Sequence, residues 1–163
     1  MSYDLSWRSW LKTTTNERKL SKGDIEQILP QREPFLFVDE ITDLVPGESV
    51  TGKKTFTGEE YFFKGHFPQM PIVPGVILME FAGQVSTFLI LTVPENKNLF
   101  GFFAGVDKFR FLKKVVPGQT LIVEATLLSF RHNVARSDSK IYCGDSLVAQ
   151  GVIVAVFVDN ETL

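Results

Sequence analysis

Cysteine and net charge are both nearly absent from this chain of 163 residues. The single cysteine, Cys143, excludes an internal disulfide and a metal site built from several thiolates, and a small strand residue is its ordinary interpretation. Because disulfides belong to oxidising compartments, their exclusion fits a cytosolic protein. The formal net charge of −2 gives no overall attraction to DNA or RNA, so we expect no nucleic-acid partner.

A signal peptide and an uninterrupted transmembrane segment are missing as well. Residues 1–12 alternate polar residues with tryptophans and lack the apolar stretch of a leader. The apolar stretch over residues 75–93 is interrupted by polar residues, among them Glu80 and Gln84, and no basic residues flank its ends closely. We therefore expect neither export nor a membrane span, and we interpret the stretch as a helix enclosed by the rest of the protein.

What the chain has in abundance is material for one hydrophobic core. It contains 44% hydrophobic residues and 15 phenylalanines, enough for one good core at this length but not for two. We predict a single domain over residues 21–163, preceded by an N-terminal arm over residues 1–20. The tryptophans of the arm can cap the domain or contact a partner, and we assign the arm no catalytic role.

The order of apolar and turn-forming residues predicts an α+β fold. A short helix is expected over residues 21–29, because Ser21 and Asp24 have capping-box spacing and Pro30 ends the pattern. A long buried helix is expected to begin at Gly75. Segments rich in β-branched and aromatic residues predict strands over 35–38, 49–56, 99–111, 120–130, 139–143 and 147–158. One long helix among mostly antiparallel strands indicates a sheet curled around that helix.

His66 and Glu80 are the leading candidates for chemistry. Glu80 is the only charged residue in the run 75–91, and burying an ionisable group is costly unless it is paired or neutralised. Gln84 follows one helical turn later and can hold the carboxyl by a hydrogen bond. His66 and Glu80 can thus supply a base and an acid at neutral pH. His132, the other histidine, lies in an expected hairpin turn and is not our candidate base.

The loop between His66 and the long helix provides a third element. Prolines at every third position, Pro68, Pro71 and Pro74, make it stiff and non-helical. Gly75 then begins the helix, so its backbone N–H is an unpaired donor that can hold a carbonyl oxygen gaining negative charge. Taken separately, each feature also has a structural explanation, namely a hydrogen-bonded histidine, a paired carboxylate and an ordinary loop-to-helix junction.

Several of these segments closely resemble the 3-hydroxyacyl-acyl carrier protein dehydratases of type II fatty acid synthesis, which have the hotdog fold. The resemblance is carried by residues 29–39, 62–68 with Pro71 and 74–76, Glu80 with Gln84, 105–111 with 116–118, and 147–150. It covers nearly everything after Ser21. In related dehydratase-isomerases the helix acid is an aspartate, so Glu80 resembles the type that dehydrates without moving the double bond.

The resemblance implies a mechanism and an assembly. His66 would take the α-proton of a 3-hydroxyacyl thioester, Glu80 would protonate the departing hydroxyl, and the Gly75 N–H would polarise the thioester carbonyl, with no metal or redox cofactor. In similar proteins the histidine and the acid meet across a homodimer interface, and dimers often gather into hexamers.

The resemblance also implies residues that bind the acyl chain and residues that bind the carrier protein. Four phenylalanines are expected either to line an acyl tunnel or to belong to the core, namely Phe81, Phe88, Phe102 and Phe103. Four basic residues form a cluster suited to an acidic acyl carrier protein, or a solvated face, namely Lys108, Arg110, Lys113 and Lys114.

Two other functions remain open from the sequence. The same helix N-terminus and carboxylate can serve attack of water on a thioester, which would make the protein a hotdog thioesterase. Alternatively, it can be a non-catalytic protein that binds acyl carrier protein and uses its N-terminal arm for recruitment.

Overall fold

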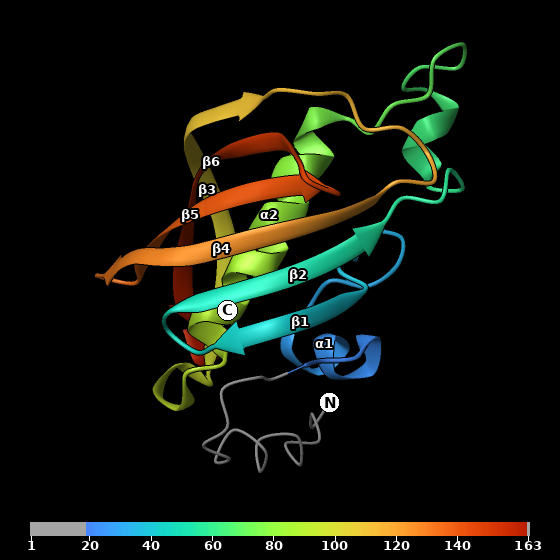
Figure 1. Cartoon of the computed structure of the whole chain (residues 1–163). Coiled ribbons are helices and arrows are strands. Elements are labelled where there is room, and N and C mark those ends of the chain that lie inside the picture. Colours follow the sequence, from blue (N-terminus) through green and yellow to red (C-terminus); the bar gives the residue numbers. More distant parts are fainter. Residues whose placement is uncertain (1–18, 163) are drawn as a thin grey trace.

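The computed structural model describes residues 19–162, in which an antiparallel sheet curves around a long helix (Figure 1). The strands are β1 (Glu40–Val45), β2 (Ser49–Thr55), β3 (Leu99–Phe111), β4 (Thr120–Arg131), β5 (Val134–Cys143) and β6 (Ser146–Asp159). Their spatial order is β1-β2-β4-β5-β6-β3, and every neighbouring pair is antiparallel. Among the described residues, β1 and β3 are therefore the two edges of the sheet.

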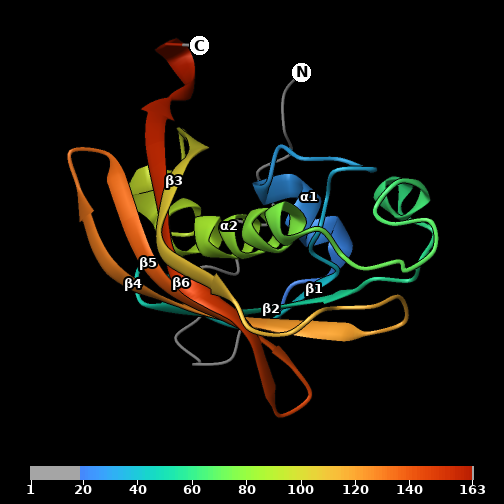
Figure 2. The ribbon, with the colours of Figure 1, turned by 90° about the horizontal axis from the view of Figure 1, so that it is seen from above.

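Helix α2 (Gly75–Leu91) lies against the concave face of this sheet, as the view from above makes clear (Figure 2). Most of its residues are buried, including polar Gln84 and Ser86. Ser86 shares a hydrogen bond of 3.1 Å with Ser139 of β5. The expected α+β architecture, a sheet curled around a helix that is apolar on nearly every side, is thus confirmed.

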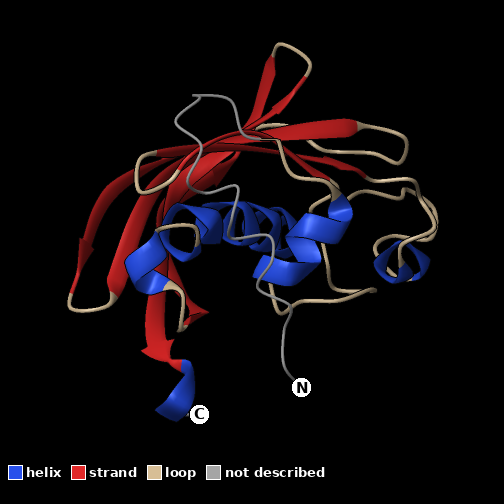
Figure 3. Cartoon of the chain, turned by 90° about the horizontal axis from the view of Figure 1, so that it is seen from below, coloured by secondary structure: helices blue, strands red, loops and turns tan. Residues whose placement is uncertain are grey.

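Helix α1 (Lys22–Ile28) also packs on the concave side (Figure 3), and the predicted capping box begins it. The Ser21 N–H donates to the Asp24 carboxylate at 2.9 Å, while the Asp24 N–H donates to Ser21 Oγ at 3.4 Å. Lys22 donates to Glu33 at 2.6 Å, and this hydrogen bond raises the pKa of Lys22. The N-terminal arm predicted over residues 1–20 lies almost entirely outside the described residues.

The strand predictions are confirmed except at two places. Four of the strands, β2, β3, β4 and β6, agree with the predicted bounds to within one residue at each end, and β5 begins at Val134 rather than at Ser139. The extra part of β5 alternates polar residues with small buried ones, including Ala135 and Ser137, so it gave no run of large β-forming side chains.

The strand predicted over residues 35–38 is wrong, and the first strand is β1. The Phe37 N–H in the predicted segment donates to the Gln84 side chain instead of to a neighbouring strand. In β1 a bulge between Ile41 and Asp43 places Ile41 and Leu44 in the core at a spacing of three. This spacing breaks the alternation by which strands are recognised.

None of the helices within residues 19–162 has the length and hydropathy needed to cross a membrane.

The approach of α2 to β2 depends on a glycine, and this gives a test of the fold. A Cβ at Gly52 would lie 2.5 Å from Val85 Cγ2 and 3.2 Å from Ile41 Cδ1, both in fully buried side chains. We expect Gly52→Ala to lower the free energy of unfolding by about 1–3 kcal/mol, because the core cannot accept the methyl group without shifting. Urea unfolding of the purified protein measures this loss.

The matched control is Gly23→Ala in α1, an exposed position where the only neighbour of the added Cβ would be Ser21 Oγ at 3.8 Å, an ordinary contact distance. Its free energy of unfolding should stay within about 0.5 kcal/mol of the wild type. An equal loss in both variants would contradict the packing argument.

Candidate active site

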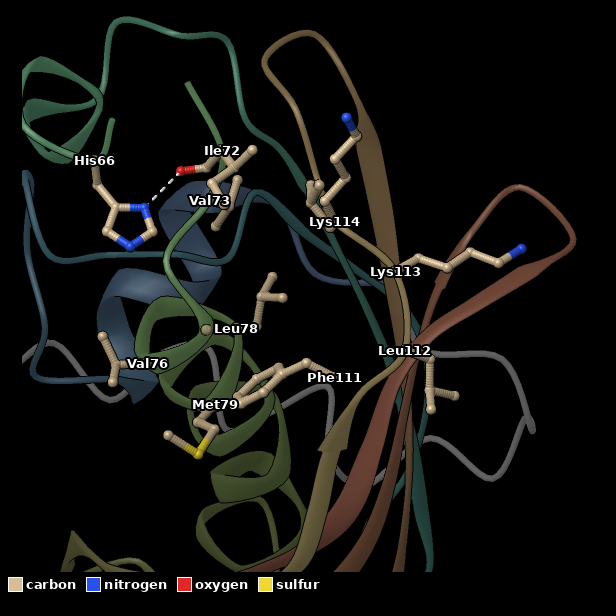
Figure 4. Close-up of a pocket in the computed structure, with 12 residues that line it drawn as sticks. His66, Ile72, Val73, Val76, Leu78, Met79, Phe111, Leu112, Lys113 and Lys114 are labelled. Carbon is tan, nitrogen blue, oxygen red and sulfur yellow. Dashed lines mark hydrogen bonds between the residues drawn. The ribbon is translucent and has the colours of Figure 1, made fainter. Parts of the chain in front are cut away.

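His66 is held by the loop between the short 3-10 helix η2 (Tyr61–Lys64) and α2. Its backbone N–H donates to Phe62 O at 2.9 Å, and its carbonyl accepts from the Ile72 N–H at 3.2 Å. The ring nitrogen Nδ1 lies 3.2 Å from Ile72 O (Figure 4). Because a carbonyl can only accept, Nδ1 carries the proton in this hydrogen bond, and in the neutral imidazole Nε2 is then the nitrogen with the lone pair. The arrangement therefore presents a nitrogen that can accept a proton.

The imidazole of His66 is also covered on one face. Its ring is stacked on that of Phe67, with centroids 4.1 Å apart and planes inclined by 24°. The hydrogen bond to Ile72 O and this stack together fix the plane of the imidazole. Phe67 itself is 48% exposed, so one face of the imidazole is covered by a side chain at the surface of the loop.

We expect Phe67→Leu to lower kcat about tenfold with little change in KM, because a loosened base loses orientation while substrate binding is kept. Phe67→Tyr should retain the stack and the activity. The ring protons of His66, followed by NMR, should lose their ring-current shift in Phe67→Leu only. A wild-type kcat in Phe67→Leu would show that the hydrogen bond to Ile72 alone orients the ring.

Gly75 lies in the same cavity as His66. The first intrahelical donors are Ile77 and Leu78, whose N–H groups bond to Pro74 O at 3.0 and 3.2 Å. The N–H groups of Gly75 and Val76 precede them and thus have no acceptor within the helix. These groups also stand at the positive end of the helix dipole. The predicted donor for a carbonyl oxygen therefore lines the same cavity as the predicted base.

The cavity has a volume of about 490 Å³. Most of its wall is apolar and comes from three places: the histidine loop, the first turn of α2, and the end of β3 with the segment that follows it (Figure 4). Val73 of the loop donates to Val115 O at 2.8 Å, which joins the first part to the third. The cavity thus has a largely apolar wall around His66 and the start of α2.

Glu80 and Gln84 form a separate polar cluster on α2. Gln84 Nε2 donates to Glu80 Oε1 at 2.9 Å, so the hydrogen bond predicted from their spacing is present. The same nitrogen donates to Phe35 O at 2.8 Å, and Gln84 Oε1 accepts from the Phe37 N–H at 2.8 Å. Because its oxygen accepts from one backbone N–H and its nitrogen donates to one backbone carbonyl, the Gln84 side-chain amide can have only one orientation. In this orientation it directs an N–H group to the Glu80 carboxyl.

Glu80 does not line the cavity that holds His66 and Gly75. At 100° per residue, Glu80 lies about 140° around the helix from Gly75, whereas Met79 lies about 40° away and does line the cavity. A single chain therefore brings together the predicted base and the predicted carbonyl donor, but it leaves the predicted acid outside.

The four phenylalanines predicted for a tunnel fall into two pairs, and none of them lines this cavity. Phe81 and Phe88 are fully buried in the core. Phe102 and Phe103 are 45% and 43% exposed on the edge strand β3. A Cβ at Gly83 would lie 2.8 Å from the Phe103 ring, which explains why a helix-weakening glycine stands in α2. Their part in a tunnel stays a prediction.

The predicted basic cluster is likewise divided. Lys113 and Lys114 line the cavity, and Lys113 donates to Ser146 Oγ at 3.0 Å. Lys108 and Arg110 are exposed on β3 and do not line the cavity. His132 has a φ of 50° in the turn between β4 and β5 and is exposed, as expected.

Two aromatic residues of this site were missed from the sequence: Phe67, which stacks on His66, and Phe111, which lines the cavity. Phe67 stands beside His66 and could have been suggested by that neighbourhood. Phe111 is 36 positions from Gly75, as 111 − 75 gives, and no pattern in the sequence connects the two.

Comparison with known proteins gives one family. The family described as FabA-like domain matches residues 29–152. A curated relative, the 3-hydroxyacyl-[acyl-carrier-protein] dehydratase FabZ of Clostridioides difficile (strain 630), is 41% identical over 141 residues, covering 86% of this chain and 99% of the relative. The enzyme of the same name from Desulforamulus reducens is 42% identical over 130 residues, covering 80% and 92%.

Solved structures agree on the fold. The dehydratase heterocomplex ApeI:P from Xenorhabdus doucetiae aligns with a TM-score of 0.69 at 15% identity, covering 84% of this chain and 92% of that one. The fluoroacetyl-CoA thioesterase FlK aligns with a TM-score of 0.61 at 13% identity, covering 73% and 92%. At these identities the likeness concerns the fold alone, and it confirms the expected hotdog fold.

Proposed function

The chain belongs to the FabA-like family, and from this membership and the geometry of its cavity we propose how it acts as a 3-hydroxyacyl-acyl carrier protein dehydratase. As a hydro-lyase of fatty acid biosynthesis, it converts the 3-hydroxyacyl thioester into the trans-2-enoyl thioester and water. The observation that carries the mechanism is the placement of His66 Nε2, with its free lone pair, in one cavity with the N–H of Gly75.

In the proposed mechanism, His66 Nε2 removes the proton from the α-carbon of the substrate. The electron pair moves toward the thioester carbonyl, whose oxygen is stabilised by the N–H of Gly75 at the start of α2. The bond between the β-carbon and its hydroxyl then breaks, and Glu80 supplies the proton that completes the leaving water. The enzyme finishes with one proton more on His66 and one fewer on Glu80, and exchange with solvent restores both.

We further propose that the Glu80 of each site comes from a second copy of the chain. Two observations support a homodimer. Glu80 does not line the cavity of its own chain, and the edge strand β3 exposes a row of large apolar side chains, including Phe102, Phe103 and Val106. A second copy seated on this edge would cover the row. Further association into a hexamer is part of the same proposal.

The carrier protein is proposed to approach at Lys113 and Lys114. These are the two basic residues that line the cavity, so a negatively charged carrier bound there would direct its acyl thioester toward His66. Lys108 and Arg110 would extend this surface along β3. A cytosolic location belongs to the proposal and agrees with the free Cys143.

The test is to follow enoyl-thioester absorbance while the purified full chain meets 3-hydroxyacyl-acyl carrier protein, and separately the trans-2-enoyl thioester. We expect reversible dehydration and hydration, with no 3-enoyl product if Glu80 acts as in the glutamate type. Release of free thiol without enoyl product would instead identify a thioesterase. Tight binding of the carrier without any reaction would identify a non-catalytic binding protein.

A further inference from the structure

The aromatic ring of Phe111 lies directly against Gly75. A Cβ added at Gly75 would lie 2.8 Å from Phe111 Cζ, 3.0 Å from Cε1 and 3.1 Å from Cε2, and these are its three nearest atoms. Gly75 does not have a positive φ, so its backbone conformation is open to any residue. The backbone would thus accept an alanine at Gly75, but its methyl group would displace either this aromatic ring or the start of α2.

The ring is held in this place by the sheet. Phe111 is the last residue of β3 and pairs with Ala149 of β6, and its ring packs on that of Phe109 with centroids 5.4 Å apart. Its other contact is α2 itself, as Figure 4 shows for its approach to the helix beside Met79. The end of β3 thus brings the ring to the first turn of the helix.

This arrangement limits how a carbonyl oxygen can reach the N–H of Gly75. The ring occupies the space that a Cβ at Gly75 would need, and the same ring lines the cavity shared with His66. Phe111 is still 50% exposed, so part of its surface is available to the apolar atoms next to a bound thioester. The ring can therefore confine a thioester between the donor and the base.

We propose that Phe111 is a positioning residue of the dehydration reaction, which directs the thioester carbonyl to the Gly75 N–H, and that Gly75 and Phe111 are a matched pair. The proposal rests on the proposed role of the Gly75 N–H. The end of β3 is then part of the active site. Phe111 acts there by orienting the substrate and takes no part in proton transfer.

A double-mutant cycle tests this pair with full-length Gly75→Ala, Phe111→Ala and the double variant, each assayed on 3-hydroxyacyl-acyl carrier protein. Gly75→Ala should lower kcat about 10²-fold, because the added methyl group displaces the helix start relative to the ring. Phe111→Ala should lower kcat about tenfold with a smaller change in KM, because orientation is lost more than binding. The double variant should recover at least about tenfold in kcat over Gly75→Ala, since the methyl group then has room.

The combination of Gly75→Ala with Phe111→Tyr is the matched control, because the ring remains and no recovery should occur. A double variant no better than Gly75→Ala would overturn the matched pair, and a wild-type kcat in Phe111→Ala would overturn the positioning role. Thermal unfolding of all variants follows the same cycle without substrate: Gly75→Ala should be destabilised and the double variant should recover. An inactive wild type would refute the proposed function, while the unfolding cycle would still decide whether the steric pair exists.

Discussion

Replacing His66 with alanine is expected to lower kcat for dehydration by about 10²–10⁴-fold, the range that a positioned general base contributes. His66 Nδ1 is engaged with Ile72 O, so Nε2 is the ring nitrogen left to accept the α-proton. The other ionisable side chains that line the cavity are those of Lys113 and Lys114, whose ammonium groups are donors without an acceptor. The rate is measured from enoyl-thioester absorbance in both directions.

The effect should fall on kcat more than on KM, because the imidazole contributes to proton transfer more than to holding the carrier. His132→Ala is the matched control, since it removes the other histidine from an exposed turn, and its kcat should equal that of the wild type. A His66→Ala protein that is folded and retains more than about a tenth of the activity would exclude His66 as the general base.

Local sequence signals predicted much of the framework of this site. The capping pair Ser21 and Asp24 located α1, and the prolines before Gly75 located the start of α2, because both signals depend on backbone chemistry within a few residues. The same locality brought His66 and Gly75 into one cavity, since a stiff loop of known length separates them.

Contacts between distant segments were beyond such signals. Gln84 holds the backbone of Phe35 and Phe37 across separations of 49 and 47 residues, and this is why a segment with strand-like composition is not a strand. The ring of Phe111 on Gly75 is a contact of the same kind. Periodicity reports which face of an element is buried, whereas the partner on that face is set by the packing of the whole fold.

Glu80 illustrates a third limit. The sequence correctly paired it with Gln84, because residues four apart in a helix are neighbours. The sequence pattern itself did not say whether Glu80 faces the cavity of its own chain, since that depends on the helical angle from Gly75 and on where the end of β3 lies. The structure leaves Glu80 out of that cavity, and this makes the assembly of two chains the central question about the site.

Glu80→Gln is therefore expected to lower kcat by about 10²–10⁴-fold. An assembly of Glu80→Gln chains with His66→Ala chains should then show whether each site takes residues from two chains. The amide can still accept from Gln84 Nε2, so folding and binding should be preserved, but its N–H groups are not acidic enough to transfer a proton to the leaving hydroxyl. Gln84→Glu is not a suitable control, because it removes the donor. The thermal unfolding curve of Glu80→Gln serves instead and should match that of the wild type.

Chains carrying His66→Ala and Glu80→Gln should be co-expressed with different tags and purified through both, so that every recovered assembly contains both variants. If each site takes His66 from one chain and Glu80 from the other, a hybrid dimer contains one site with both residues intact and one with neither. Its activity per dimer should then be about half that of the wild type, although each variant alone is nearly inactive. If both residues of a site came from the same chain, every site in the hybrid would lack one of them, and the hybrid would be as inactive as its parents. Recovery of activity is thus diagnostic of the shared site, because no other pairing of these two variants restores a complete acid and base.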